Sequence, residues 1–137
     1  MAGYSGKPLV QKLGLKSGST IALLGAPRGY ARTLAKPPSG VTHRTSAVGP
    51  LDFIQFFTSE KQELERRFAA LARALAPAGM LWISWPKRSS GVATDLTEDV
   101  IRAIGLAHGL VDVKVAAVDD VWSALKFVRR VKDRRAR

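Results

Sequence analysis

The chain has 137 residues, 46% of them hydrophobic, which suits one globular domain with one sizeable core. It contains no cysteine, so disulfides, thiolate metal sites and thiol catalysis are excluded. Because it has no signal-like start and no apolar run of about 18 residues, we expect a cytoplasmic protein without membrane association. His43 and His108 lie far apart and lack the spacing of a metal motif, so we expect no metal site.

The formal net charge is +11 and is distributed unevenly along the chain. Residues 1–51 have seven basic and no acidic residues, residues 52–125 have eight and ten, and residues 126–137 have seven and one, so the three parts carry +7, −2 and +6. This asymmetry favours an anionic partner such as nucleic acid, but a basic tail that binds polyanions without specificity gives the same pattern. The candidate residues for such contacts are Lys7, Lys12, Lys16, Arg129, Arg130 and Arg134.

The first part of the chain predicts a helix, a strand and a second helix. Residues 3–14 fit a short helix, because Pro8 suits the first helical position and Gly14 suits the position after the last one. The apolar run Thr20 to Leu24 is typical of a buried strand. We expect a short helix to follow and to extend through Leu34.

A glycine-containing turn connects this strand to the second helix. The segment Gly25-Ala26-Pro27-Arg28-Gly29-Tyr30 is similar to the opening of a nucleotide-binding half, but it has two glycines rather than three, and Pro27 removes a backbone N–H. The next predicted strand, Val41 to Val48, is followed by no acidic residue before Asp52, so an acid for a ribose hydroxyl is absent. We interpret both glycines mainly as turn residues. The ligand-binding candidates in this turn are Gly25, Arg28, Gly29 and Tyr30.

Leu51 to Phe57 predicts a third strand. Strict alternation would place Leu51, Phe53 and Phe57 on one face of the sheet. Asp52 lies near the start of this strand, away from the edge where ligands bind, so we expect it to be structural.

The clearest helix is predicted from Ser59 to Ala76. Ser59 and Gln62 have the spacing of a capping box, and Pro77 and Gly79 end the pattern. One apolar stripe recurs at helical spacing and consists of Leu64, Phe68, Leu71 and Leu75.

Met80 to Trp85 is a short apolar run that predicts a buried central strand, and a polar loop and another helix follow it. Two starts compete for this helix. Asp95, with an acid three residues later, resembles a capping box, whereas Thr97 as N-cap would place Leu96 and Ile101 in a hydrophobic staple. We prefer Thr97, which leaves Asp95 in the loop and free for another task.

A strand, a polar loop and a helix in this order form the place where open α/β sheets bind ligands. The loop therefore supplies a second group of ligand-binding candidates: Lys87, Arg88, Ser89, Ser90 and Asp95. The alternative is an ordinary solvated connection with a helix cap, and the sequence leaves both open.

The rest of the chain predicts a helix at about Glu98 to His108 and an antiparallel hairpin of Val111 to Val118 with Ala124 to Val131. Residues 1–131 would form a single α/β domain and residues 132–137 a frayed basic tail. The order of elements predicts a three-layer sandwich with a Rossmann-like, mostly parallel sheet and a C-terminal antiparallel hairpin.

The second half resembles the later part of class I S-adenosylmethionine-dependent methyltransferase domains. There, a strand and helix precede a segment of pattern L-x-P-G-G-x-L-x-I, which Leu75-Ala76-Pro77-Ala78-Gly79-Met80-Leu81-Trp82-Ile83 matches. The resemblance covers about residues 51–131 and implies a reduced methyltransferase-like fold. The cofactor half departs from the family, because Leu23 and Leu24 stand where an acid is expected before Gly25, and the chain is too short for every strand.

The whole chain also resembles a family of small bacterial proteins of unknown function. The matching segments are LGLKSGSTIALLGAP, GPLDFIQFF, GMLWISWPK, GVATDLTEDVIR and GLVDVKVAAVDDVWSALKFVRR. This resemblance implies a bacterial, stand-alone domain and carries no known reaction, so no catalytic residue is assigned.

Three functions follow. The first is a non-catalytic binding or adaptor module without a cofactor, because no nucleophile–base pair is visible. The second is a divergent methyltransferase that binds S-adenosylmethionine, with Tyr30, Lys87, Ser89 and Asp95 lining the site and Lys87 or Arg88 holding an anionic group. The third is sequence-independent nucleic-acid binding through the basic residues. The sequence favours the first and leaves open whether the protein is an enzyme.

Overall fold

The computed structural model describes residues 7–34 and 37–134. Their strands are β1 (Thr20–Leu24), β2 (Thr42–Arg44), β3 (Leu51–Phe57), β4 (Leu75–Pro86), β5 (Leu110–Ala117) and β6 (Trp122–Arg129). Their α-helices are α1 (Leu9–Leu13), α2 (Tyr30–Leu34), α3 (Lys61–Ala74) and α4 (Glu98–Ala107), and two 3-10 turns are η1 (Arg88–Ser90) and η2 (Val131–Asp133).

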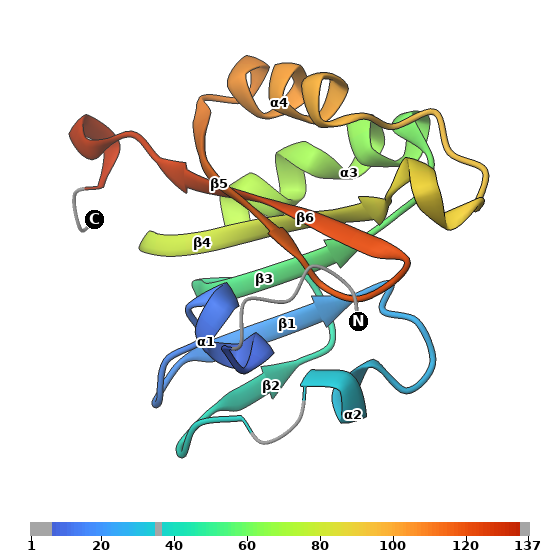
Figure 1. The fold of residues 1–137 in the computed structure, drawn as a ribbon. Coiled ribbons are helices and arrows are strands. Elements are labelled where there is room, and N and C mark those ends of the chain that lie inside the picture. Colours follow the sequence, from blue (N-terminus) through green and yellow to red (C-terminus); the bar gives the residue numbers. More distant parts are fainter. Residues whose placement is uncertain (1–6, 35–36, 135–137) are drawn as a thin grey trace.

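The strands of the described residues form one six-stranded sheet in the order β2-β1-β3-β4-β6-β5 (Figure 1). Neighbours from β2 to β4 are parallel, and β6 is antiparallel to both β4 and β5. This arrangement confirms the predicted Rossmann-like sheet and its C-terminal hairpin. Because β1, β3 and β4 are parallel, their last residues meet at one side of the sheet, which we call the carboxyl edge.

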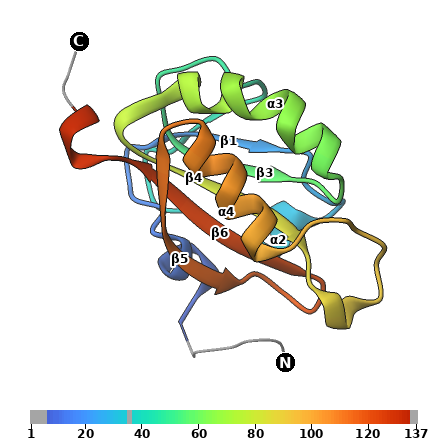
Figure 2. The ribbon, with the colours of Figure 1, turned by 90° about the horizontal axis from the view of Figure 1, so that it is seen from above.

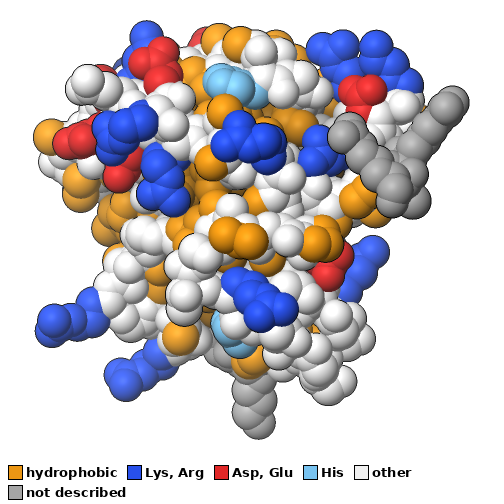
Figure 3. All heavy atoms as spheres, turned by 180° about the vertical axis from the view of Figure 1, so that it is seen from behind, with side chains coloured by type: hydrophobic (Ala, Val, Ile, Leu, Met, Phe, Trp, Pro, Cys, Tyr) orange, Lys and Arg blue, Asp and Glu red, His pale blue; other side chains and the backbone are white. Residues whose placement is uncertain are grey.

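Helices cover both faces of the sheet (Figures 1 and 2). On one face, α3 and α4 bury an apolar cluster with β3, β4 and β6 that includes Leu64, Phe68, Ile101, Ile83 and Phe127. On the other face, α1 and α2 pack on a second cluster that includes Leu13, Tyr30, Leu34, Phe53 and Trp82. The predicted three-layer sandwich is therefore confirmed. Figure 3 views the molecule from behind, on the side of α3, where hydrophobic side chains show between scattered basic ones.

The prediction that Leu51 shares a face with Phe53 and Phe57 is wrong. Leu51 packs in the cluster under α3, whereas Phe53 and Phe57 pack on the side of α1 and α2. The pairing of β3 with β4 shifts register between Leu51 and Phe53. This irregularity breaks the alternation of the strand, so its first residue turns to the opposite face.

The start of α3 also differs from the prediction. The helix begins at Lys61, and neither Ser59 nor the N-cap Glu60 caps it with a side chain. Instead, the carboxylate of Asp95 accepts a hydrogen bond of 2.7 Å from the backbone N–H of Lys61. The helix ends at Ala74, because the following residue already belongs to β4.

The start of α4 is as predicted. Thr97 is the N-cap, and its hydroxyl oxygen accepts a hydrogen bond of 3.2 Å from the backbone N–H of Val100. Leu96 and Ile101 are both buried, as a hydrophobic staple requires. Elsewhere, β2 is shorter than the predicted strand, and part of the predicted tail forms η2. Residues 3–6 of the predicted first helix and residues 135–137 of the tail lie outside the described part.

Candidate functional site

The turn between β1 and α2 lies at the carboxyl edge and depends on two glycines in left-handed conformations. Gly25 has φ +68°, and a Cβ atom placed on it would lie 2.7 Å from the backbone oxygen of Phe57. The fold therefore requires glycine there, because β1 ends tightly against β3. Gly29 has φ +82°, but a Cβ atom on it would meet no atom within 4 Å. The turn is thus packed at Gly25 and open at Gly29.

Tyr30, the first residue of α2, connects this turn to the middle of the sheet. Its buried hydroxyl donates a hydrogen bond of 2.6 Å to Oε1 of Gln55, and Nε2 of Gln55 donates one of 3.0 Å to the hydroxyl of Ser84. Burial raises the pKa of the Tyr30 phenol well above its usual value, so the hydroxyl stays protonated. We expected Tyr30 to line a ligand site, and the structure shows its hydroxyl engaged within the protein.

A row of aromatic rings borders the carboxyl edge on the side of α2. The rings of Tyr30 and Phe57 meet edge to face with centroids 4.7 Å apart, and those of Phe57 and Trp122 do so at 5.2 Å. The loop before Trp122 is held by Asp119, whose carboxylate accepts hydrogen bonds from the backbone N–H groups of Val121 and Trp122. The row gives this part of the edge a rigid apolar wall.

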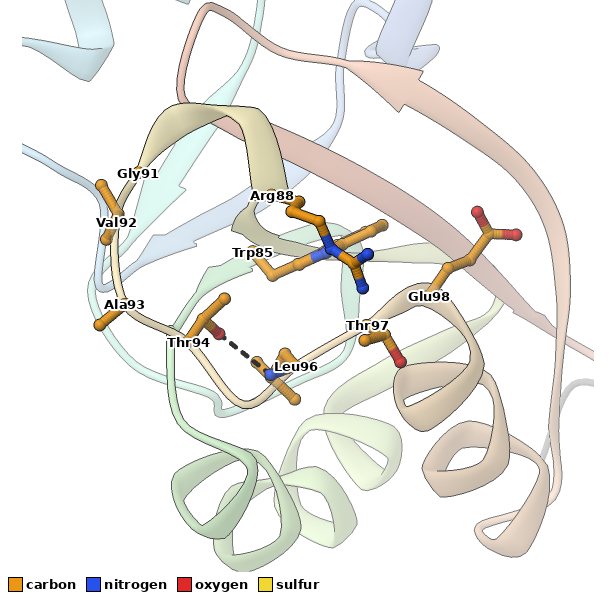
Figure 4. A pocket seen from close by; sticks show the side chains of 9 residues that line it. All are labelled: Trp85, Arg88, Gly91, Val92, Ala93, Thr94, Leu96, Thr97 and Glu98. Atoms are coloured by element: carbon orange, nitrogen blue, oxygen red, sulfur yellow. Dashed lines mark hydrogen bonds between the residues drawn. The ribbon is translucent and has the colours of Figure 1, made fainter.

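A cavity of about 440 Å³ lies at the end of β4, between the loop that follows it and the first turn of α4. Figure 4 shows the side chain of Arg88 extending over Trp85 toward the start of α4, whereas Glu98 points away from the loop. Glu98 is instead paired with Arg102 of the same helix. The cavity therefore combines an aromatic wall with one cationic side chain. Its lining consists of Trp85, Arg88, Gly91, Val92, Ala93, Thr94, Leu96, Thr97 and Glu98.

The loop that forms the cavity is anchored to the start of α3. The hydroxyl of Thr94 donates a hydrogen bond of 2.6 Å to the backbone oxygen of Ser59 and accepts one from Leu96 N–H. Asp95, which we expected to be free, binds the N–H of Lys61 beside it. The two contacts join residues that are 34 and 35 positions apart in the sequence, and they fix the loop to the start of α3.

The structure separates the five candidates of this loop. Arg88 lines the cavity, and the other four are not among its lining residues. The backbone N–H of Lys87 donates a hydrogen bond to the backbone oxygen of Val121, and the hydroxyl of Ser90 accepts a hydrogen bond from the N–H of Val92.

Four residues of this region were not predicted from the sequence: Gln55, Ser84, Trp85 and Thr94. A signal existed for the first two, because Gln55 lies inside the apolar run Phe53 to Phe57 and Ser84 lies inside the otherwise apolar strand β4.

The basic candidates fall into two separate groups. Near the C-terminus, the guanidinium of Arg129 donates hydrogen bonds to the backbone oxygens of Ala72 and Leu75, at the end of α3. Arg134 in turn donates to the backbone oxygen of Arg129. Lys12 and Lys16 belong instead to α1 and the turn after it. Among the described residues, no three His, Cys, Asp or Glu side chains gather as a metal site would require.

No protein-family model and no curated protein matches the sequence. Several solved methyltransferases have a similar fold. An S-adenosylmethionine-dependent methyltransferase from Aquifex aeolicus is 15% identical with a TM-score of 0.64, over 87% of this chain and 86% of that one. Precorrin-6y C5,15-methyltransferase from Geobacter metallireducens is 12% identical with a TM-score of 0.62, over 89% and 86%. Magnesium protoporphyrin IX methyltransferase from Synechocystis is 16% identical with a TM-score of 0.61, over 89% and 74%, and was solved with S-adenosylmethionine bound.

These likenesses show that the chain has the fold of class I methyltransferases, as the resemblance in its second half implied. They also correct the expectation that no cofactor is involved, because structures of this fold hold S-adenosylmethionine or its demethylated product. At 12–16% identity the fold alone is shared. The resemblance to a small bacterial family stays a prediction. No helix in the described segments has both the length and the apolar character to cross a membrane.

Proposed function

We propose that this protein binds S-adenosylmethionine at the carboxyl edge and transfers its methyl group to an acceptor held beside Arg88. The observation that carries the proposal is the turn after β1, where Gly29 is left-handed and open to approach. This turn occupies the place where open α/β sheets bind ligands. The fold of methyltransferases supports the same ligand class. This proposal replaces the adaptor hypothesis that the sequence favoured.

The turn fits such a ligand through its backbone and not through carboxylates. Gly29 has no side chain to block approach, and Tyr30 fixes the turn through Gln55 and Ser84. An acid is missing before Gly25 and also after β2, where Thr45 and Ser46 follow Arg44. When bound, the cofactor supplies an activated methyl group. This chain would hold it by shape and by backbone donors, and we therefore expect modest affinity.

The cavity beside η1 suits the acceptor. Trp85 and Leu96 are buried and would exclude water from its inner wall, and the guanidinium of Arg88 would bind an anionic group of the acceptor. At the same edge, the carboxylates of Asp95 and Asp119 already accept hydrogen bonds from backbone N–H groups. These two carboxylates are thus held by the backbone, and proximity and orientation of the two substrates would account for the rate of transfer.

Calorimetric titration with S-adenosylhomocysteine tests the binding step. We expect saturable binding with a dissociation constant of ~10–100 μM, which is about −5.5 to −7 kcal/mol. Gly29→Ala should weaken it at least about tenfold, because the added methyl group enters the open side of the turn. Gly109→Ala is the matched control, since Gly109 has φ +84°, equally open surroundings and a position just after α4. Absence of heat at millimolar ligand, or equal losses in both variants, would refute the proposal.

A further inference from the structure

Four lysines gather on the face of the sheet that α1 covers, outside the site described above. Lys114 of β5 and Lys126 of β6 are directly opposite each other in the antiparallel ladder. Lys126 is also opposite Trp82 of β4, whose indole N–H donates a hydrogen bond of 2.9 Å to the backbone oxygen of Leu13 in α1. Residues opposite one another in adjacent strands point to the same face. Lys114 and Lys126 therefore both point toward α1.

α1 brings the other two lysines to the same place. The ammonium of Lys114 donates a hydrogen bond of 3.2 Å to the backbone oxygen of Lys12, and the ammonium of Lys12 donates one of 2.8 Å to the backbone oxygen of Ala117. Lys16 follows in the turn after α1 and is exposed. We call Lys12, Lys16, Lys114 and Lys126 the lysine cluster. It combines residues from two parts of the chain about a hundred positions apart.

Three members of the cluster, Lys16, Lys114 and Lys126, form no ion pair with a carboxylate of the described residues. Burial lowers the pKa of Lys126, and the positive charges of Lys114 and Lys16 lower it further. The ion pairs of the described residues all involve Arg102, so Lys16, Lys114 and Lys126 have no acidic partner there. Asp112 of β5 pairs with Arg102. Asp52 lines a hollow beside Lys16, but its carboxylate accepts the backbone N–H of Thr20.

We propose that the lysine cluster is a binding site for phosphate groups, separate from the carboxyl edge. Like charges gathered on a partly buried surface destabilise the free protein, and a polyanion would remove that cost. Lysine ammonium groups bind phosphate as point charges, without the planar geometry that arginine imposes. The contrast with the opposite face supports this, because in Figure 3 basic side chains there are spread out and several lie beside acidic ones.

The position of the cluster keeps it apart from the proposed methyltransferase site. Lys126 is level with Trp82, four residues before the end of β4 at Pro86. Lys16 precedes β1, so it lies at the opposite end of that strand from the Gly25 turn. Binding at the cluster should therefore not require S-adenosylmethionine. The phosphate groups could come from the backbone of a single-stranded nucleic acid or from a free polyphosphate, and the test distinguishes the two.

The test is fluorescence anisotropy of a labelled single-stranded RNA of mixed sequence, with unlabelled tripolyphosphate as competitor. The double variant Lys114→Gln/Lys126→Gln is compared with Arg130→Gln/Lys132→Gln, which removes the same charge from exposed residues near the C-terminus. We expect the first to weaken RNA binding by about tenfold or more and to reduce the slope of log affinity against log salt by about 1.4. We expect the second to change the affinity by less than about threefold.

Each outcome bears on the proposal. RNA binding that tripolyphosphate displaces only in large molar excess assigns the site to nucleic acid, whereas tight, cluster-dependent binding of tripolyphosphate without RNA binding assigns it to a free polyphosphate. Equal losses in the two variants would show diffuse charge attraction and overturn the proposal. So would the absence of binding to both probes. Circular dichroism verifies that both variants fold, and without ligand the lysine variant should melt at a higher temperature than the wild type, because repulsion is relieved.

Discussion

Gly105→Ala tests the packing of α4 on the sheet, because two opposing effects meet at this position. Gly105 lies inside the helix and is buried. A Cβ atom built on it would lie 2.0 Å from Cε1 of Phe127 and 2.5 Å from Cζ. The ring of Phe127 is fully buried and meets the ring of Phe68 edge to face, with centroids 5.7 Å apart. The ring therefore has little room to move away.

The sizes of the two effects decide whether Gly105→Ala stabilises or destabilises the protein. Replacing glycine by alanine inside a helix stabilises it by about 1 kcal/mol through backbone entropy. A methyl group forced into a packed core costs about 1–3 kcal/mol, and a contact at this distance belongs at the upper end of that range. We therefore expect a net loss of about 1–2 kcal/mol. For a chain of this size that loss lowers the melting temperature by roughly 2–8 °C.

Urea unfolding followed by circular dichroism measures this loss. Ala103→Gly is the control, because Ala103 is exposed in the same helix, so its substitution should cost about 1 kcal/mol from propensity alone. Phe127→Leu combined with Gly105→Ala should cost less than the sum of the two single changes, since the smaller side chain makes room. A higher unfolding midpoint for Gly105→Ala would refute the reasoning, because it would mean that α4 does not press on Phe127.

Three further predictions concern buried or bonded polar groups. The variant Tyr4→Phe leaves Tyr30 as the only tyrosine. Its phenolate absorbance should not rise near the usual pKa of about 10 while the protein is folded, and the free energy of unfolding should fall above that pH. Titration of Tyr30 near pH 10 in the folded protein would contradict this. Asp95→Ala should lower the free energy of unfolding by about 1 kcal/mol, because the backbone N–H of Lys61 loses its acceptor. Asp95→Asn keeps an acceptor oxygen and should lower the free energy of unfolding by less. Equal decreases in the two variants would argue against the cap. The lowered pKa of Lys126 means that the unfolded chain holds the proton of this side chain more tightly than the folded protein does. The free energy of unfolding should therefore rise as the pH approaches about 10. In Lys126→Met, the urea midpoints should lack this part of the rise.

The elements with local signals could be predicted, and those set by distant contacts could not. The cap at Thr97 needs only its own neighbours, and the sequence identifies it. The start of α3 depends on Asp95, which is 34 residues away, so the Ser59 capping box was a plausible but wrong prediction. The orientation of Leu51 depends on a register shift against β4 that no periodicity in β3 reveals.

The same division holds for the candidate site. The position of Arg88 follows from the order of strand, loop and helix, and that order is visible in the sequence. The contact of Tyr30 with Gln55 and Ser84 joins three elements and has no sequence pattern of its own. The lysine cluster needs the pairing of β5 with β6, so charge counting found Lys12 and Lys16 but not Lys114 and Lys126.

The charge of the first 51 residues leads to a last prediction about the proposed cofactor. This part of the chain forms α1, β1, α2 and β2 and carries seven basic residues but no acidic one. S-adenosylmethionine carries a positive sulfonium that S-adenosylhomocysteine lacks. Among charged side chains, the first 51 residues contribute only basic ones to the proposed site, and the carboxylates of Asp95 and Asp119 at the same edge already accept hydrogen bonds from backbone N–H groups, so the local charge should favour the second ligand. We expect S-adenosylhomocysteine to bind about threefold to tenfold more tightly in low salt, and the ratio to shrink toward one near 0.5 M salt, where charges are screened within about 4 Å. Calorimetric titrations with both ligands at two salt concentrations measure the ratio.

Tighter binding of S-adenosylmethionine would require a carboxylate close to the sulfonium. Asp119, which lies in the loop before Trp122, would then be the residue to replace, and Asp120→Asn would serve as its control.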